Sequence, residues 1–534
     1  MSSTTTSTRS GDAAVLRRIF RLHFWVGLFA APVLVVLACT GLVILYSQPL
    51  DNWLNGDLLT VTQGPETVPL DQQVATAQRQ VGEGYTLEAV TPPDAPGHST
   101  RVDFLPPDAP AYPAGEANNT QVFVDPYTGN YLGQRSALSG LVGYANQVHR
   151  MFGNDGPKIQ LPSLGHLIDP TSYPDATIPV GIGNLWMEVT AGWILVLLGS
   201  GLYLWWPRAI QSAKPLLKIR WGKGGRIRWR DLHALTGVVL SVILICYVLS
   251  GLTWSRYWGE NWRAFSATVA PSTSVDAPST PAKMGDYDRL GRRIAWAATD
   301  DPVYASQPGG PTASPISFAD VDRIAKDEGM VPGYAIIPPS NSTESGETTW
   351  GSYTVVNRWP QKLSEQRTLY LDQFTGATIT NATTAQDGAL SRLTSFGIAM
   401  HMGNQLGVLT RISATLACLG VLTSVVTGFL MWWKRRPTGG TGLPKPANAA
   451  TRAATPKRAV KAVSIAAVFL GVLYPAFGVS VLVVLGVEVV LSIRRRSRGA
   501  EVEPVAVADE LAADDDEVPV TVDGGEDVPV GALQ

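Results

Sequence analysis

The chain has 534 residues, of which 45% are hydrophobic, and a formal net charge of −2. Its apolar residues are gathered in long blocks, which indicates a membrane protein. The sequence contains no glycine-rich nucleotide motif, no H-E-x-x-H and no C-x-x-C, so nicotinamide, flavin, ATP and such zinc sites are unsupported. The basic stretch 214–230 lies beside two apolar blocks, where lipid headgroups explain it better than nucleic acid does.

Four segments have the roughly 20 apolar residues that a helix needs to cross the hydrocarbon core. They are Phe24–Tyr46, Leu185–Trp206, Leu232–Trp254 and Val408–Trp433. Two shorter apolar stretches, Val460–Tyr474 and Val479–Ile493, predict a C-terminal helical hairpin. The predicted fold class is an α-helical membrane bundle of four long helices in two repeats plus this hairpin, with two extracytoplasmic domains. All three cysteines fall inside apolar spans, so we expect no disulfides in the external segments.

Lys and Arg are concentrated beside alternate ends of the spans, which places both termini in the cytoplasm of a multi-pass protein of the bacterial plasma membrane. The predicted parts are a disordered N-terminus (1–14), span one (15–46), a first external domain (47–184), span two (185–206), a basic loop (207–231), span three (232–254), a second external domain (255–392), an outer helix with span four (393–433), a linker (434–459), the hairpin (460–493) and a disordered acidic tail (494–534).

The two halves of the chain resemble each other. Each external segment is predicted to contain a helix, then a strand, then a turn. In the first segment these are Leu70–Val81, Thr120–Val124 and 125–129. In the second segment they are Phe318–Glu328, Arg367–Leu371 and 372–376. The spans match as well. Their small-residue pairs are Thr40-Gly41, Ser200-Gly201, Ser250-Gly251 and Thr427-Gly428. Gly41 and Gly251, eighteen residues after His23 and His233, allow helices to pack closely, or admit the edge of a flat macrocycle.

Histidine is scarce, with six residues in the chain, yet four lie at or near the ends of apolar spans. His23 and His233 each begin an L-H-x-x-x-G motif at the start of an outward-running span. His149 and His401 precede inward-running spans, so topology sorts the four into an inner and an outer layer. His166 in the long insertion after Gly153 competes with His149 for the outer layer. We expect His98, beside a proline-rich stretch, to be a loop residue.

Facing imidazoles inside a helical bundle are a common means of holding haem iron. Two pairs of histidines therefore predict two haems, ligated by His23 with His233 and by His149 with His401. Bis-histidine ligation leaves no open position on the iron and suits electron transfer. The structural alternative for each histidine is a capping residue or one that faces lipid headgroups.

Over most of residues 15–495, the sequence resembles the PepSY-associated transmembrane family, which includes iron-regulated membrane proteins and inner-membrane ferric-siderophore reductases. The resemblance rests on Leu22-His23, Leu232-His233, the Trp-Trp span ends at 205–206 and 432–433, the turns 125–129 and 372–376, and His401-Met402-Gly403. It implies small α+β PepSY domains outside the membrane and two b-type haems inside the bundle.

The resulting hypothesis is a membrane ferric-siderophore reductase, an enzyme that passes electrons from a quinol or a cytosolic reductase to ferric siderophore iron outside. No residue is expected to act as a general acid or base. The alternative is a non-enzymatic membrane-anchored protein whose PepSY-like domains bind an envelope protein or protease. A repeat-built transporter is less favoured, because the spans contain few acidic or basic residues besides Glu188 and Glu488.

Overall fold

The computed structural model describes residues 3–107, 119–152, 157–211, 219–222, 225–273, 275–287, 294–308, 313–344, 346–357, 362–444 and 447–497. Two parts of the sequence discussed above lie outside these residues: Gly153, and the acidic tail that follows Ser497. The first helix, α1 (Ser3–Leu45), already includes residues 3–14, so our expectation of a disordered N-terminus is corrected there.

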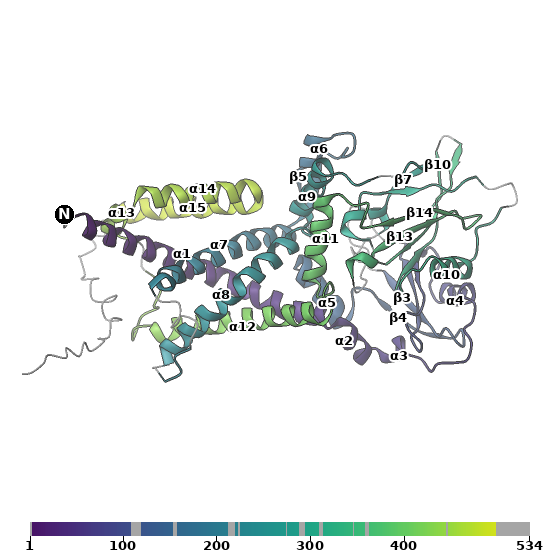
Figure 1. Ribbon diagram of the computed structural model, residues 1–534, viewed down its shortest axis with the longest axis horizontal. Coiled ribbons are helices and arrows are strands. Elements are labelled where there is room, and N and C mark those ends of the chain that lie inside the picture. Colours follow the sequence, from purple (N-terminus) through teal and green to yellow (C-terminus); the bar gives the residue numbers. More distant parts are fainter. Residues whose placement is uncertain are drawn as a thin grey trace, which may run out of the picture. The chain divides into compact units, whose positions relative to one another are not determined.

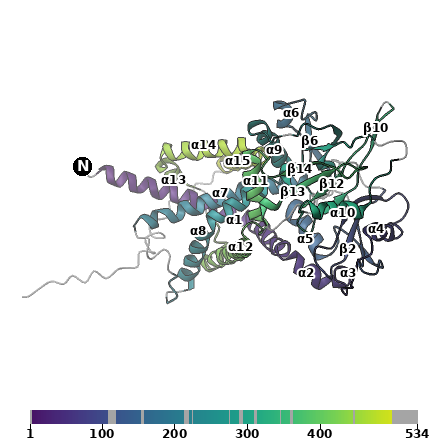
Figure 2. The same ribbon diagram turned by 45° about the vertical axis from the view of Figure 1, so that its right-hand side comes forward.

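Four long apolar helices lie side by side in both views of the ribbon (Figures 1 and 2). They are α1, α7 (Ile182–Gln211), α8 (Gly225–Leu252) and α12 (Val408–Arg435). Each is long and apolar enough to cross a membrane, which confirms the four predicted spans. The helices pack in a ring, α1 on α7, α7 on α8, α8 on α12 and α12 on α1, so they share one interior. Helices suit this role because they satisfy their own backbone hydrogen bonds in lipid.

The two external segments share one antiparallel sheet of eight strands, in the order β14-β13-β12-β9-β1-β2-β3-β4. The strands are β1 (Thr86–Thr91), β2 (Thr100–Leu105), β3 (Thr120–Val124), β4 (Tyr131–Ser136), β9 (Ala335–Ile337), β12 (Tyr353–Val356), β13 (Arg367–Leu371) and β14 (Thr378–Thr383). Four come from each segment, and Val90 of β1 pairs with Ile336 of β9 at the joint. The strands therefore hold the two segments together.

Helices α4 (Leu70–Gln78) and α10 (Phe318–Asp327) contribute to a hydrophobic core that contains residues from both segments, such as Val102, Val321 and Leu369. The carboxylate of Asp71 on α4 accepts hydrogen bonds from the backbone N–H groups of Phe318 (2.8 Å) and Ala319 (3.0 Å) at the start of α10. These N–H groups have no partner within the helix, and a negative charge there is favourable. Asp71 thus joins the two segments.

The turns predicted from the D-x-x-T-G motifs have the same hydrogen bonds in both segments. Oδ1 of Asp125 accepts from the backbone N–H groups two and three residues on, and Oδ1 of Asp372 does the same. Gly129 (φ 72°) and Gly376 (φ 70°) adopt the left-handed conformation, which side chains disfavour and glycine does not. The glycine of each motif is therefore required by its turn.

A second hydrophobic cluster contains Ala89 of the first segment and residues of the second, among them Tyr304 of β8 (Pro302–Tyr304), which pairs with β7 (Ser279–Lys283). Tyr304 and Tyr370 pack edge to face in it, with ring centroids 4.8 Å apart. Asp301 immediately precedes β8.

The two short apolar stretches predicted near the C-terminus fall in α14 (Lys457–Leu473) and α15 (Pro475–Ser497). Proline is well placed at the first position of a helix, where its missing N–H is no loss. Phe477 is fully buried against Trp193 of α7, with ring centroids 5.2 Å apart. A Cβ on Gly192 would collide with the Phe477 ring, so this glycine makes room for the hairpin turn. Residues from 480 on belong to a separate compact unit.

Candidate metal centre

The first pair of histidines lies between two helices of the bundle. His23 comes from α1 and His233 from α8. Their ring centroids are 6.3 Å apart, and the ring planes are nearly perpendicular, at 83°. The two L-H-x-x-x-G motifs thus meet in space.

The second pair is carried by two shorter helices, α5 (Gly140–Met151) and α11 (Ala389–His401). The rings of His149 and His401 have centroids 6.4 Å apart and planes at 83°, almost the geometry of the first pair. Gly403 (φ 78°) and Gly407 (φ 58°) lie in the turn between α11 and α12. The two glycines after His401 therefore belong to the turn that leads from α11 into α12.

Each of the four histidines is fixed through Nδ1 by a hydroxyl group on a bundle helix. The pairs are His149 with Thr40 (2.9 Å), His23 with Ser200 (3.0 Å), His401 with Ser250 (3.1 Å) and His233 with Thr427 (3.2 Å). The four hydroxyl residues are those of the Ser/Thr-Gly pairs repeated in the spans. One structural motif is therefore used four times.

The glycine of each Ser/Thr-Gly pair contacts the same imidazole. A Cβ on the glycine would lie 3.1–3.4 Å from Cε1 of the histidine, at Gly201 for His23, Gly251 for His401, Gly41 for His149 and Gly428 for His233. These separations are tighter than ordinary van der Waals contact. We had considered Gly41 and Gly251 as sites for the edge of a macrocycle; in the structure all four glycines accommodate the imidazole rings themselves.

The hydrogen bonds also determine which ring nitrogen bears the proton. Nδ1 of His23 lies 3.2 Å from the carbonyl oxygen of Leu197, and Nδ1 of His233 lies 3.0 Å from that of Ser424. A carbonyl oxygen only accepts, so Nδ1 must carry the hydrogen in both rings. In the neutral imidazole this leaves the lone pair on Nε2, the form in which histidine binds metals.

The hydroxyl groups agree with this tautomer. Each of them donates its own hydrogen to a carbonyl one turn earlier in its helix, as Thr40 does to Val36 (2.7 Å) and Thr427 does to Thr423 (2.7 Å). Ser200 and Ser250 donate in the same way, to Leu197 and Cys246. The hydroxyl oxygen is then free to accept from the histidine Nδ1–H.

The spacing of the rings fits a metal held between two opposed imidazoles. Two metal–nitrogen bonds of about 2.0 Å on opposite sides of an ion put the ring centroids about 6 Å apart. Both observed separations, 6.3 and 6.4 Å, match. Within the described residues, no three His, Cys, Asp or Glu side chains gather as ligands. A metal between either pair would take its other ligands from another molecule, as the iron of haem takes four from its porphyrin.

The two pairs lie at different levels of the bundle. Along α1, His23 is eighteen residues from Gly41, which contacts His149; this corresponds to about 27 Å of helix. The same number of residues on α8 separates His233 from Gly251, which contacts His401. The four histidines therefore lie in two layers, one toward each end of these helices.

The remaining histidines lie elsewhere. Nδ1 of His166, on α6 (Leu164–Ile168), is 2.9 Å from the carbonyl oxygen of Tyr173 in the same loop. His98 forms a hydrogen bond with Asp94, with Nδ1 2.5 Å from Oδ1. Of the two alternatives for the outer layer, the structure places His149, and not His166, beside His401.

These features define a membrane protein in which four apolar helices surround or contact two histidine pairs, one carried by α1 and α8 and the other by α5 and α11, and connect to a large antiparallel sheet. The model of the PepSY-associated TM region matches residues 20–435, so the chain belongs to this family. No curated protein matches the sequence.

Proposed function

We propose that the protein is a membrane electron-transfer protein with two b-type haems. His23 and His233 would hold one of them, and His149 and His401 the other. The observation that carries the proposal is the fourfold motif, in which a hydroxyl and a glycine fix one imidazole with Nε2 available. A bound haem supplies one-electron chemistry through its iron.

The residues around each pair support electron transfer over oxygen chemistry. The two imidazoles of a pair would both bind the iron of a haem, which would leave the iron no open position for a substrate. Contacts between Nδ1 and the hydroxyl groups of Ser200 or Thr427 keep each ring oriented without help from the cofactor. Ligands that are already in position reduce the rearrangement on binding and on a change of iron charge.

The direction of transfer follows from the charges beside the spans. Lys434 and Arg435 lie at the end of α12 near the level of His233, and basic residues of this kind stay in the cytoplasm. Electrons would then enter at His23 and His233, from a quinol or a cytosolic reductase, and leave at His149 and His401. Ferric iron of a siderophore is a suitable acceptor, because Fe(II) prefers softer donors than the hard oxygen ligands that bind Fe(III). The protein would act as a ferric-siderophore reductase of the plasma membrane.

A reduced-minus-oxidised visible spectrum of the purified full chain, with pyridine haemochrome quantification, tests the proposal. We expect about two b haems per chain, since each pair supplies the two axial ligands of one iron. His233→Ala and His401→Ala should each remove one haem, while the matched control His166→Ala should keep both. A chain without haem, purified after expression with added haem, would overturn the proposal. It would favour a membrane-anchored protein that binds an envelope partner.

A further inference from the structure

Two segments outside the four spans form a small platform beside the bundle. One is the insertion between α5 and α7, with β5 (Lys158–Pro162), α6 and β6 (Thr177–Gly181). The other is helix α9 (Arg256–Val269), which follows the membrane helix α8 after a short turn. The platform packs on the start of α7 through both β6 and α9.

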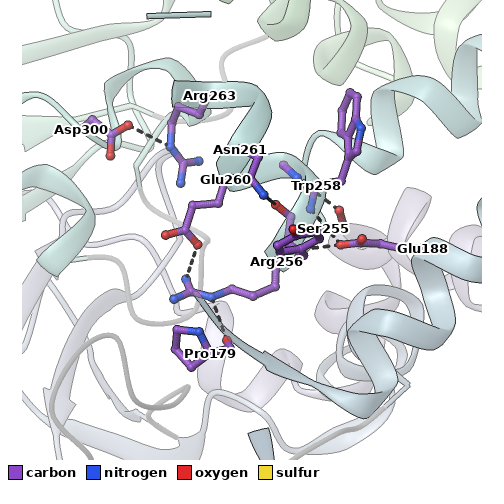
Figure 3. Close-up of polar contacts among 11 residues, drawn as sticks. Pro179, Glu188, Ser255, Arg256, Trp258, Glu260, Asn261, Arg263 and Asp300 are labelled. Carbon is purple, nitrogen blue, oxygen red and sulfur yellow. Dashed lines mark hydrogen bonds and ion pairs between the residues drawn. The ribbon is translucent and has the colours of Figure 1, made fainter. Parts of the chain in front are cut away.

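Polar contacts fix the platform to the bundle (Figure 3). The buried carboxylate of Glu188 on α7 accepts hydrogen bonds from the backbone N–H groups of Tyr257 and Trp258 at the start of α9, both at 3.0 Å. Glu188 therefore caps a helix. The Arg256 guanidinium donates to the carbonyl of Pro179 on β6 (3.4 Å), which holds the insertion to α9.

The two short helices are joined directly. Asn261 of α9 accepts a hydrogen bond from the backbone N–H of Leu164 at the start of α6 (2.7 Å). A Cβ on Gly165 would lie 3.0 Å from the Cβ of Ala264, so the helices touch at two small residues. α6 and α9 consequently present their outer side chains as one surface.

That surface is apolar along one line of α9. One face of the helix carries its large apolar side chains, Trp258, Trp262, Phe265 and Val269. The opposite face carries ion pairs, which involve Arg256, Glu260 and Arg263. Val269 is 58% exposed, and Leu167 of α6 is 72% exposed. Leu164, Ile168 and Phe265 are exposed beside them. Adjacent exposed apolar groups of this kind mark a surface for binding.

The line of apolar residues meets the end of an apolar helix outside the four spans. The indole N–H of Trp258 donates to the carbonyl of Leu473 (2.8 Å), and its ring packs on Tyr474, with centroids 5.4 Å apart. Leu473 ends the apolar helix α14, whose last turns expose Val468, Phe469 and Val472. The apolar face of α9 is thus continuous with an apolar helix, and tryptophan is the residue enriched where a membrane meets water.

We propose that α6 and α9 lie in the surface of the bilayer, on the side of the β-sheet, with their apolar side chains inserted among the lipids. An amphipathic helix binds in this way, with its charged face toward water. The anchor reaches the second histidine pair, because the indole N–H of Trp262 donates to Thr394 of α11 (3.0 Å), the helix that ends with His401. Lipid contact at α9 would therefore stabilise the position of His401.

Fluorescence quenching in nanodiscs tests this placement. The native cysteines of the full chain are first replaced by alanine. Two variants of this chain each receive one new cysteine, Leu167→Cys or Val269→Cys, which is labelled with an environment-sensitive dye. The nanodiscs contain phosphatidylcholine and phosphatidylglycerol, with or without bromine on the acyl chains. Glu347→Cys on β11 (Glu347–Thr349), an exposed site of the sheet region, is the matched control.

We expect brominated lipid to quench the labels at 167 and 269 several-fold more strongly than the label at 347. Equal, weak quenching at all three positions would overturn the proposal, as would quenching at only one of the two platform positions. The exposed positions tolerate the substitution, and an unchanged elution volume on gel filtration verifies the fold of each labelled variant. The test does not depend on haem, so its result is separate from that of the proposed function.

Discussion

Nδ1 of His149 donates a hydrogen bond to Oγ1 of Thr40 at 2.9 Å, linking residues that are 109 positions apart. The contact places the imidazole of α5 against the C-terminal end of α1, where Gly41 leaves room for the ring. A second such contact, of His401 with Ser250, mirrors it across the pair. The orientation of both rings is thus determined by the bundle.

Replacing Thr40 by valine should weaken haem binding at the second pair, because valine keeps the shape of threonine and removes the acceptor for Nδ1–H. Loss of such a supporting hydrogen bond typically lowers metal affinity by about 10–100-fold. Haem titration of the apoprotein would measure the change. Thr423→Val is the control, since that hydroxyl donates only to Leu419 of its own helix. Equal affinity in the two variants would contradict the role assigned to Thr40.

Two glycines of α7 offer a matched steric test. A Cβ on Gly201 would lie 3.1 Å from Cε1 of His23, while a Cβ on Gly199 would meet nothing within 4 Å. Gly201→Ala should therefore shift the His23 ring and lower the haem content or change the spectrum of the first pair. Gly199→Ala should leave both unchanged, although the two substitutions alter helix propensity equally, by about 1 kcal/mol. Identical spectra for the two variants would show that the glycine does not set the ring position.

The perpendicular rings predict a magnetic signature. Axial imidazoles at 83° leave two d orbitals of a low-spin ferric iron nearly equal in energy. The oxidised protein should then give a strongly anisotropic electron paramagnetic resonance signal at low temperature, and not the rhombic signal of parallel imidazoles. Ser250→Ala frees one side of the His401 ring and should move the signal of that pair toward the rhombic type. A rhombic signal from the unaltered protein would contradict the observed ring angle.

Part of this architecture could be predicted from the sequence. Blocks of apolar residues give the spans directly, and the direction of each span sorts His23 with His233 and His149 with His401. The partners of the histidines were not identified, although the repeated Ser/Thr-Gly pairs were visible. A hydrogen bond between helices depends on which faces meet, and the sequence of one helix does not contain that information.

The sheet and the platform were missed for different reasons. The eight-stranded sheet depends on the pairing of Val90 with Ile336, a contact between strands far apart in the chain. Helix α9 had a readable signal, because Trp258, Trp262, Phe265 and Val269 follow the helical period. We had treated that segment as part of a polar external domain, which obscured its amphipathic character.

The external region should lose stability as the pH rises from about 4 to about 7. Burial raises the pKa of Asp301 to about 7, with the carboxylates of Asp387 and Asp300 adding to the effect. Burial likewise raises the pKa of Asp387 to about 6, which Arg392 partly opposes. Because the folded protein holds these protons more tightly than the unfolded chain, their contribution is complete below the unfolded pKa. It is lost as the pH passes the folded values.

Asp301→Asn should remove most of this dependence, because the amide stays neutral beside Asp387. After allowing for partial solvent access, the difference between about pH 5 and about pH 8 should be of the order of 2 kcal/mol. Melting temperatures of the detergent-purified chain at both pH values measure it. Asp320→Asn, at an exposed position of α10, is the control and should leave the dependence intact. A variant at position 301 that keeps the full pH dependence would mean that other groups carry it. Asp387, which precedes the His401 helix, would then be the next position to replace.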